Sequence, residues 1–277
     1  MIKRRLLPVL AVLLLPGLLR AAPEADLWER WQTHDPDSRL SVDHSPWTAF
    51  LETYLVQGED GINRVDYGDV TPQDRARLDA YLEALEATGV DRLTRASQLS
   101  FWVNLYNALT VQVVLEHFPV DSIREIDISP GFFANGPWGK KLVEVEGEAL
   151  SLDDVEHRIL RPIWRDPRIH YAVNCAARGC PNLQPVAFTP ENTEALLKKG
   201  AIDYVNHPRG VLIRDGDLVV SSIYKWFQED FGGSETGVID HLLHYARPGL
   251  RERLRDFREI DDHRYDWSLN IKNGVRS

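Results

Sequence analysis

A long helix that is apolar on most sides constrains the fold of this chain more than any other feature. Between Thr94 and Phe118, apolar side chains recur at intervals of three and four residues, which is the period of an α-helix. Further apolar residues between them widen the stripe, so several neighbouring elements must pack around the helix. We therefore predict a central buried helix over residues 94–118.

Two carboxamides interrupt this apolar helix. Asn104 and Asn107 lie three positions apart, so they share a face. A buried carboxamide without partners costs about 1–3 kcal/mol, so both need hydrogen-bonding groups nearby. Two interpretations stay open: the pair ties the helix to the loop after His170, or it takes part in a site at that loop.

The rest of the chain mixes helices and strands without regular alternation. Proline and glycine positions, capping residues and apolar periodicity predict helices over 45–58, 71–89, 151–164, 189–206, 223–231 and 238–245. Strands are expected over 63–67, 122–129, 142–145, 168–174 and 265–270, with a two-residue hairpin over 211–220. This pattern favours an α+β fold over a doubly wound parallel sheet. We expect the central helix to pack on a small mixed or antiparallel sheet, with other helices around it.

The start of the chain is typical of a secretory signal peptide. Three basic residues precede the apolar run Leu6–Leu19, which is short for a membrane span and contains two prolines. We predict a signal peptide over 1–22, a polar segment over 23–44 and a single domain over 45–277. The protein is then periplasmic or secreted, and an uncleaved N-terminal anchor is the less favoured alternative. No other stretch is long and apolar enough to span a membrane.

Composition excludes several classes of protein. With 277 residues, 43% hydrophobic and 27% charged, the chain can build a sizeable core, unlike a disordered segment or a small disulfide scaffold. Its formal charge is −10, and loss of residues 1–22 would make it −14 because four basic residues and no acidic ones are removed. A broad surface for nucleic acid or anionic lipid is therefore not expected. We predict no cofactor, and the partner is a small-molecule or protein ligand of unknown identity.

The segment HYAVNCAARGCP contains both cysteines of the chain. Cys175 is a candidate nucleophile, with His170 or His157 as its general base and Arg178 as a source of positive field. Asn174 lies in the same segment, and together with Asn104 and Asn107 it is a candidate to orient the base or to donate to an oxyanion. Two alternatives stay open: a disulfide between Cys175 and Cys180, or a zinc site that also uses His170.

Two further features bear on a site. Asp153 and His157 are four residues apart on a predicted helix, where they either fix an imidazole tautomer or form a surface ion pair. Phe132, Phe133 and Trp138 lie in a glycine-rich loop and either wall a substrate cleft or cover the core.

Four ordered blocks of the sequence resemble the domain of unknown function 547 family. They are Gln98–Thr110, Ser151–His157 with Ile159–Arg161, Asp166–Pro181, and Tyr265–Asn270. The resemblance implies one domain, with a core over about residues 95–205, in which Glu156–His157, Asn174–Cys175 and the two central asparagines are signature positions. This chain has Ala176 where the family pattern has glycine and Gly179 where it has serine. The layout is also similar in outline to papain- and transglutaminase-type folds.

The family has no assigned activity, so function has to be argued from the residues. Our first hypothesis is thiol-dependent acyl transfer or amide hydrolysis, in which Cys175, His170, His157 and Asn104 act on the reacting groups. Asn107, Arg178, Glu156 and Asn174 would then bind the substrate. The rival hypothesis is a non-catalytic binding or scaffold domain in which Cys175 and Cys180 form a structural disulfide.

Overall fold

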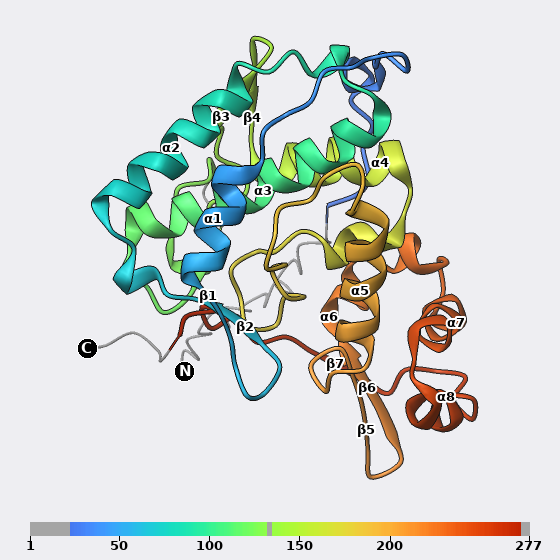
Figure 1. The fold of residues 1–277 in the computed structure, drawn as a ribbon. Coiled ribbons are helices and arrows are strands. Elements are labelled where there is room, and N and C mark those ends of the chain that lie inside the picture. The colour runs from blue at the N-terminus through green and yellow to red at the C-terminus, as the bar shows by residue number, and fades with distance from the viewer. Residues whose placement is uncertain (1–22, 132–134, 273–277) are drawn as a thin grey trace, which may run out of the picture.

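The structure is a computed structural model that describes residues 23–131 and 135–272 (Figure 1). The predicted signal peptide over 1–22 lies outside the described residues, and so do Phe132 and Phe133 of the glycine-rich loop. No helix within the described ranges is both long enough and apolar enough to cross a membrane.

The predicted central helix is confirmed as α3 (Arg95–His117). The Thr94 side chain accepts a hydrogen bond from the backbone N–H of Ser97, so the helix begins with a satisfied N-cap. From Phe101 to Val111 every residue is buried, as its apolar faces require. Pro119 follows the helix end, where a residue without an N–H cannot extend the hydrogen-bond ladder.

Helices surround α3 on several sides (Figure 1). Helix α2 (Pro72–Glu86) packs along α3 and against α1 (Ser45–Tyr54), and a π-helix (Asp154–Leu160) that continues into α4 (Arg161–Trp164) packs on α3 as well. The remaining helices follow the cysteine loop in the chain. They are α5 (Thr193–Val205), α6 (Ser222–Trp226), α7 (Glu235–Tyr245) and α8 (Pro248–Leu254).

The strands form three small sheets. Two are antiparallel pairs, β1 (Leu55–Gln57) with β2 (Asn63–Val65), and β3 (Val143–Val145) with β4 (Glu148–Leu150). The third is mixed: β5 (Val211–Arg214) and β6 (Asp217–Ser221) form the predicted hairpin, and β7 (Asp262–Arg264) pairs parallel to β6. The α+β class is therefore confirmed. The expectation of one sheet under the central helix is wrong, because α3 packs mainly on helices.

Three predicted strands differ from the structure. Residues 122–129 contain a 3-10 helix (Ile123–Glu125), and residues 168–174 fall largely in another (Pro167–Tyr171). The second helix begins where the Asp166 side chain accepts the backbone N–H of Arg168 and proline occupies the first helical position. Residues 265–270 form no regular strand and contribute only an isolated bridge between Leu269 and Ala177.

Several helix ends also differ. Helix α1 stops at Tyr54 because residues 55–57 leave it to pair as β1, and α5 begins at Thr193 after a turn that starts at Thr189. Short 3-10 helices lie at Glu29–Gln32, Tyr67–Asp69, Val90–Arg92 and Gln228–Phe231.

Two hydrophobic clusters make up the core. The larger one surrounds α3 and includes Ile169, whereas the smaller one joins α5, α6, α7 and the β5–β6 hairpin and includes Tyr171. The 3-10 helix Pro167–Tyr171 thus lies between the clusters, and the cysteine loop that follows it starts at their junction.

Candidate functional site

A cavity of about 570 Å³ opens at this junction. Its volume falls within the range of small-molecule sites. Four of the predicted site residues line it: Glu156, His157, His170 and Cys175. Residues from several other parts of the chain complete the lining, and they include Tyr106, Arg124, Trp138, Asp153, Cys180, Trp226, Phe227, Tyr265 and Trp267.

The π-helix presents Glu156 and His157 to this cleft. It begins with a capping box, in which the Asp154 carboxylate accepts the backbone N–H of Ser151 and the Ser151 hydroxyl accepts the backbone N–H of Asp154. Its end is marked by the backbone N–H of Arg161, which donates to the carbonyl of Glu156. The wider π turn is uncommon in proteins and is often found at functional sites.

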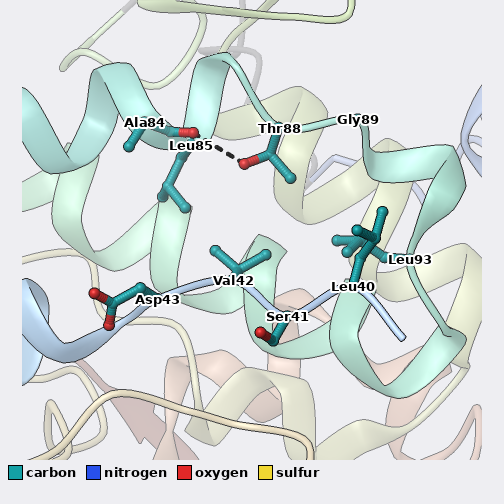
Figure 2. A pocket seen from close by; sticks show the side chains of 9 residues that line it. All are labelled: Leu40, Ser41, Val42, Asp43, Ala84, Leu85, Thr88, Gly89 and Leu93. Atoms are coloured by element: carbon teal, nitrogen blue, oxygen red, sulfur yellow. Dashed lines mark hydrogen bonds between the residues drawn. The ribbon is translucent and has the colours of Figure 1, made fainter. Parts of the chain in front are cut away.

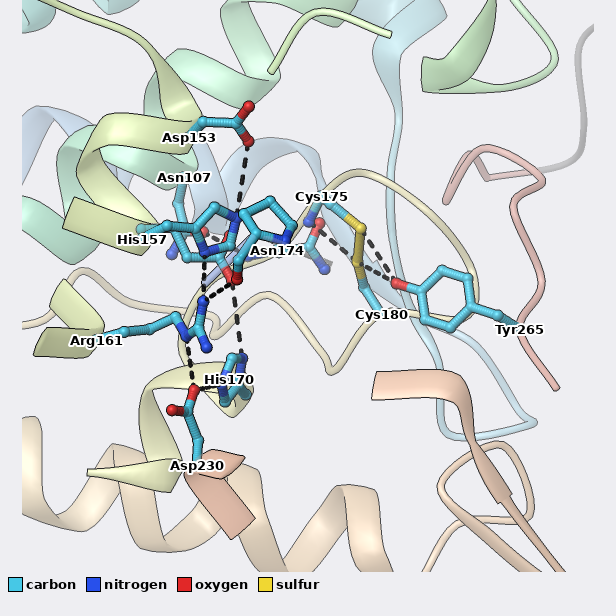
Figure 3. A network of polar contacts seen from close by, with 12 residues as sticks. Asn107, Asp153, His157, Arg161, His170, Asn174, Cys175, Cys180, Asp230 and Tyr265 are labelled. Carbon is cyan, nitrogen blue, oxygen red and sulfur yellow. Dashed lines mark hydrogen bonds and ion pairs between the residues drawn. A yellow bond between two sulfur atoms is a disulfide. The ribbon is translucent and has the colours of Figure 1, made fainter. Parts of the chain in front are cut away.

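A chain of polar contacts joins the two histidines (Figure 3). Nη1 of Arg161 donates to Nδ1 of His157 at 3.0 Å, and Nε of Arg161 donates to the Asp230 carboxylate at 2.6 Å. The same carboxylate oxygen lies 2.6 Å from Nε2 of His170. At the other end, Asp153 lies 3.7 Å from Nε2 of His157.

These contacts define the tautomer of each imidazole. A guanidinium can only donate, so Nδ1 of His157 accepts and its proton is on Nε2. Burial, followed by the nearby charge of Arg161, holds the pKa of His157 well below its usual value, so the ring is neutral. His170 donates from Nε2 to Asp230, and burial lowers its pKa although Asp230 opposes the shift.

Asp230 is the anion that orients this network. Burial alone would raise its pKa, but hydrogen bonds from His170 and Arg161 lower it to about 2, so the carboxylate is ionised at neutral pH. Arg161 is thereby neutralised by its partner, and only 5% of its side chain is exposed. The two groups add little net charge to the cleft.

Glu156 is the titratable group of the cleft that is poised near neutrality. Burial raises its pKa to about 7, while the charge of Arg161 and a hydrogen bond from Tyr106 oppose that shift. Its Oε1 lies 3.7 Å from the unprotonated Nδ1 of His170. A buried carboxyl group that titrates near pH 7 in a cleft is a typical feature of functional sites.

Aromatic rings form the opposite side of the cleft. We call Trp138, Trp226, Tyr265 and Trp267 the aromatic wall. Trp267 is their centre, with ring centroids 5.7 Å from Trp138, 5.6 Å from Trp226 and 4.7 Å from Tyr265. Trp226 stacks on Trp267 with 29° between the ring planes, whereas Trp138 and Tyr265 meet it at 67° and 56°. Aromatic rings offer apolar surface and electron-rich faces, which suit apolar and cationic groups. Trp138 therefore lies in a cleft wall, as one of the two interpretations of its loop proposed.

The two sulfur atoms at the cleft are bonded to each other. Cys175 and Cys180 form a disulfide, and the hydroxyl of Tyr265 lies 3.1 Å from the first sulfur and 3.0 Å from the second (Figure 3). In this form neither residue is a thiol. The structure therefore gives no support to a resting thiol nucleophile, nor to a zinc site made of His170 and both cysteines.

The asparagines hold backbone segments rather than lining the cleft. Asn107 donates to the carbonyl of Ala172 at 2.9 Å and accepts the backbone N–H of Asn174 at 2.8 Å. Asn104 makes the same pair of bonds to the backbone of Phe188. Both therefore satisfy their buried amides, and Asn107 ties α3 to the loop after His170.

Asn174 closes the cysteine loop. Its side chain donates to the carbonyl of Pro181 at 2.7 Å and accepts the backbone N–H of Ala176 at 2.9 Å. Ala176 has a φ of 58°, a conformation that glycine adopts at lower cost, which accounts for glycine in the family pattern. A Cβ at Gly179 would lie 2.8 Å from the backbone nitrogen of Asp266, so the serine of that pattern would not fit here without a shift.

Arg178 lies apart from the described lining of the cleft. Its backbone N–H donates to Ser268, and its charge acts on Asp60, whose pKa is lowered mainly by hydrogen bonds from Arg64. The structure thus gathers Glu156, His157, His170 and Cys175. Among the described residues, Arg178, Asn104, Asn107 and Asn174 do not line this cavity.

A second, smaller hollow lies between the N-terminal polar segment and the end of α2 (Figure 2). Its volume is about 290 Å³, and aliphatic side chains such as Leu40, Val42 and Leu93 form much of its surface. It contains one carboxylate, Asp43, and no histidine or cysteine among the described residues. It therefore has fewer groups than the larger cleft that could bind a polar ligand or transfer a proton.

Sequence reasoning missed several residues that complete the cleft. Asp230 is 60 residues from His170, and nothing in its local sequence indicates that contact. Trp226 and Phe227 were assigned only to a short helix, and Arg161 only to a family block. No cluster of three or more His, Cys, Asp or Glu side chains suited to a metal ion occurs in the described ranges.

Comparison with known proteins identifies part of the chain. Residues 90–205 match the family model described as "Protein of unknown function, DUF547". No curated protein and no solved structure gave a significant match, so the similarity to papain- and transglutaminase-type folds gains no support. The matched region contains Glu156, His157, His170 and the disulfide, whereas Asp230, Trp226 and the Tyr265–Trp267 segment lie beyond it. Residues 90–205 of this chain are therefore a DUF547 family domain, and later residues complete its cleft.

Proposed function

We propose that the protein binds a small organic cation with an apolar body in the cleft between the π-helix and the aromatic wall. The observation that carries this proposal is the placement of Asp153 and Glu156 in the same 570 Å³ cavity as three tryptophans. Carboxylates attract a positive head group, and the faces of tryptophan rings attract both cations and apolar groups. This proposal follows the binding alternative rather than thiol-dependent acyl transfer.

The charges around the cleft favour a cation. Both histidines are neutral because their pKa values are lowered, and the charge of Arg161 is matched by Asp230. Arg124 also lines the cleft, but its guanidinium lies over the ring of Trp267, 5.3 Å from the centroid. We therefore place the positive head of the ligand at Glu156 and its apolar body along the rings.

Acyl transfer by Cys175 is less well supported. The sulfur is bonded to Cys180, and its neighbouring polar group is the hydroxyl of Tyr265 rather than an imidazole in the contacts described. A thiol mechanism would require prior reduction of the bond. The neutral His157 and His170, the candidate bases, instead border the acidic end of the cleft.

The test uses three probes of the same size and different charge: benzylamine, benzyl alcohol and benzoate. Three tryptophans line the cleft, so titration is followed by intrinsic fluorescence and repeated by calorimetry. Benzylamine should bind with a Kd of about 1 mM, which is typical for so small a ligand, and at least about tenfold more tightly than benzoate. Equal affinities, or tighter binding of benzoate, would refute the proposal.

Two variants locate the binding site. Glu156→Gln removes the charge and should weaken benzylamine binding several-fold, whereas Glu144→Gln, at the exposed position of β3, should leave it unchanged. Trp226→Phe should reduce the fluorescence response, whereas Trp164→Phe, outside the described lining of the cleft, should preserve it.

We also propose that the protein is exported, as the first 22 residues suggest. A disulfide is compatible with this proposal, because such bonds persist in oxidising compartments. Mass spectrometry of the mature protein should show the loss of about 22 residues from the precursor. An intact N-terminus on protein in the cytoplasmic fraction would contradict export.

A further inference from the structure

The two sulfur atoms of the disulfide have different surroundings. Cys180 is 3% exposed, whereas Cys175 is partly exposed, and both residues line the cleft. A nucleophile that enters the cleft therefore reaches the sulfur of Cys175 more readily. The rate of thiol–disulfide exchange depends on which sulfur is attacked and on how well the other one leaves.

The two sulfur atoms also differ in their hydrogen-bond donors. The hydroxyl of Tyr265 lies 3.1 Å from Cys175 and 3.0 Å from Cys180, but only the sulfur of Cys180 also accepts the backbone N–H of Cys175, at 3.0 Å. An amide N–H can only donate, so the direction of this last bond is certain. Burial raises the pKa of Tyr265 well above its usual value, so its hydroxyl keeps its proton and is able to donate. The sulfur that is harder to reach is thus the one equipped to carry negative charge.

From this asymmetry we infer that the Cys175–Cys180 bond is a thiol–disulfide exchange centre for low-molecular-weight thiols that enter the cleft. The thiolate of the small molecule attacks the sulfur of Cys175 and forms a mixed disulfide. The sulfur–sulfur bond breaks, and its electron pair leaves with Cys180, whose thiolate is stabilised by the N–H of Cys175 and the hydroxyl of Tyr265.

A second small thiol completes the reaction. Its thiolate attacks the small-molecule sulfur of the mixed disulfide and releases Cys175 as a thiolate. The thiolates of Cys175 and Cys180 then each take a proton from solvent, which balances the two protons that the small thiols lost on ionisation. In total, two small thiols are oxidised to one disulfide, and the protein is reduced to its dithiol form. The cavity of about 570 Å³ has room for such molecules. This activity uses the same cleft as the proposed cation but does not require that ligand.

The first test identifies the attacked sulfur. Oxidised protein is mixed with mercaptoethanol at about pH 8, where the small thiol is partly ionised, then alkylated and digested for mass spectrometry. The mercaptoethanol adduct should be on Cys175 and the alkyl group on Cys180. Adducts mainly on Cys180, or equally on both residues, would overturn the inference.

The second test measures the role of the hydroxyl. Tyr265→Phe keeps the ring of the aromatic wall but removes the donor, and it should slow exchange by about tenfold, the effect of one hydrogen bond to a charged group. The control is Tyr224→Phe, since Tyr224 is a buried tyrosine whose hydroxyl contacts Tyr171 and which does not line the cleft. Equal rates for Tyr265→Phe and the wild-type protein would count against the inference.

A third comparison separates a reactive bond from a sealed structural one. Exchange in the native protein should be at least as fast as in the same chain unfolded in concentrated urea, because unfolding removes both donors. A native rate more than about tenfold slower would show a bond protected by the fold and would overturn the inference.

The charge of the thiol distinguishes this inference from the proposed function. If both hold, cysteamine should react faster than mercaptoethanol, and mercaptopropionate more slowly. Equal rates for the three thiols, with the adduct still on Cys175, would leave exchange intact and contradict the cation preference. Binding of benzylamine in preference to benzoate, without any exchange at the disulfide, would support the proposed function and overturn this inference.

Discussion

Oε1 of Glu156 and Nδ1 of His170 lie 3.7 Å apart at the buried end of the cleft. His170 donates its Nε2 proton to Asp230, so the nitrogen that faces Glu156 carries a lone pair. With the pKa of Glu156 raised to about 7 by burial, this carboxyl group is partly protonated at neutral pH. The relationship makes Glu156 the group through which pH acts on the cleft.

The raised pKa of Glu156 should make the stability of the fold depend on pH. The pKa of Glu156 in the folded protein, about 7, lies above the ordinary value of 4.5. The contribution of this carboxyl group to the free energy of unfolding is therefore fully present below about pH 4.5 and is lost as pH rises through 7. In urea denaturation, Glu156→Gln should therefore gain on the order of 1–3 kcal/mol relative to wild type between those pH values. Glu144→Gln, at an exposed position, should show no such trend. If the difference in unfolding free energy between Glu156→Gln and wild type did not change with pH, the raised pKa of Glu156 would be contradicted.

Ligand affinity should have a matching pH dependence. A cation binds the ionised carboxylate, so benzylamine should bind more tightly as pH rises from about 6 to 8 through the pKa of Glu156. Over that range the gain is up to about tenfold, since the carboxylate fraction rises accordingly. Calorimetric titrations of the Glu156→Gln variant should give an affinity that is independent of pH. The same slope in both proteins would assign the titration to another group.

The carboxamide of Asn107 should be important for stability although it does not line the described cleft. Asn107→Ala leaves the carbonyl of Ala172 and the N–H of Asn174 without their partner, which should cost about 2–4 kcal/mol. Gln112→Ala on the same helix is the control, because Gln112 is half-buried and bonds only the Asp79 side chain in the contacts described. Chemical denaturation measures both, and similar small losses would contradict a clamping role for Asn107.

The backbone at Ala176 should favour glycine. Its positive φ of 58° costs a residue with a Cβ roughly 1 kcal/mol, so Ala176→Gly should be neutral or stabilise by up to about 1 kcal/mol. Ala177→Gly in the same loop, at a buried position without positive φ, should instead destabilise the protein. Thermal denaturation of the two variants compares them directly, and a loss of stability for both would argue against strain at Ala176.

Local sequence patterns were sufficient for the elements whose structure depends on local interactions. The apolar period of α3, the helix starts at Thr71 and Ser151 and the β5–β6 hairpin were all predicted and are all present. Each is determined by residues within one or two turns of each other. The short strand β2 was also predicted, although its partner β1 was assigned to a helix.

The segment over 168–174 shows why local patterns are not enough. Its alternation of polar and apolar residues fits a strand, but Asp166 and Pro167 form a helix start that competes with it. The capping interaction prevails because Ile169 and Tyr171 then pack into different clusters of the core. Tertiary packing, which the sequence does not display, decides between the two patterns.

The same limit applies to the site. Clustering of Glu156, His157, His170 and Cys175 could be expected from the family blocks, and these four residues do line one cleft. Asp230 and most of the aromatic wall (Trp226, Tyr265 and Trp267) come from segments 50 or more residues further along the chain, and their contacts exist only in the folded protein. The sequence alone therefore could not predict that the cleft has an acidic end and an aromatic wall.

The most direct test of the proposed function is a crystal structure of the protein soaked with benzylamine. We predict an ammonium nitrogen within about 4–6 Å of the Glu156 carboxylate, the range in which opposite charges interact strongly, with the ring against the aromatic wall. Benzylamine in the smaller hollow beside Leu40, or bound with its ammonium group turned away from Glu156, would contradict the account.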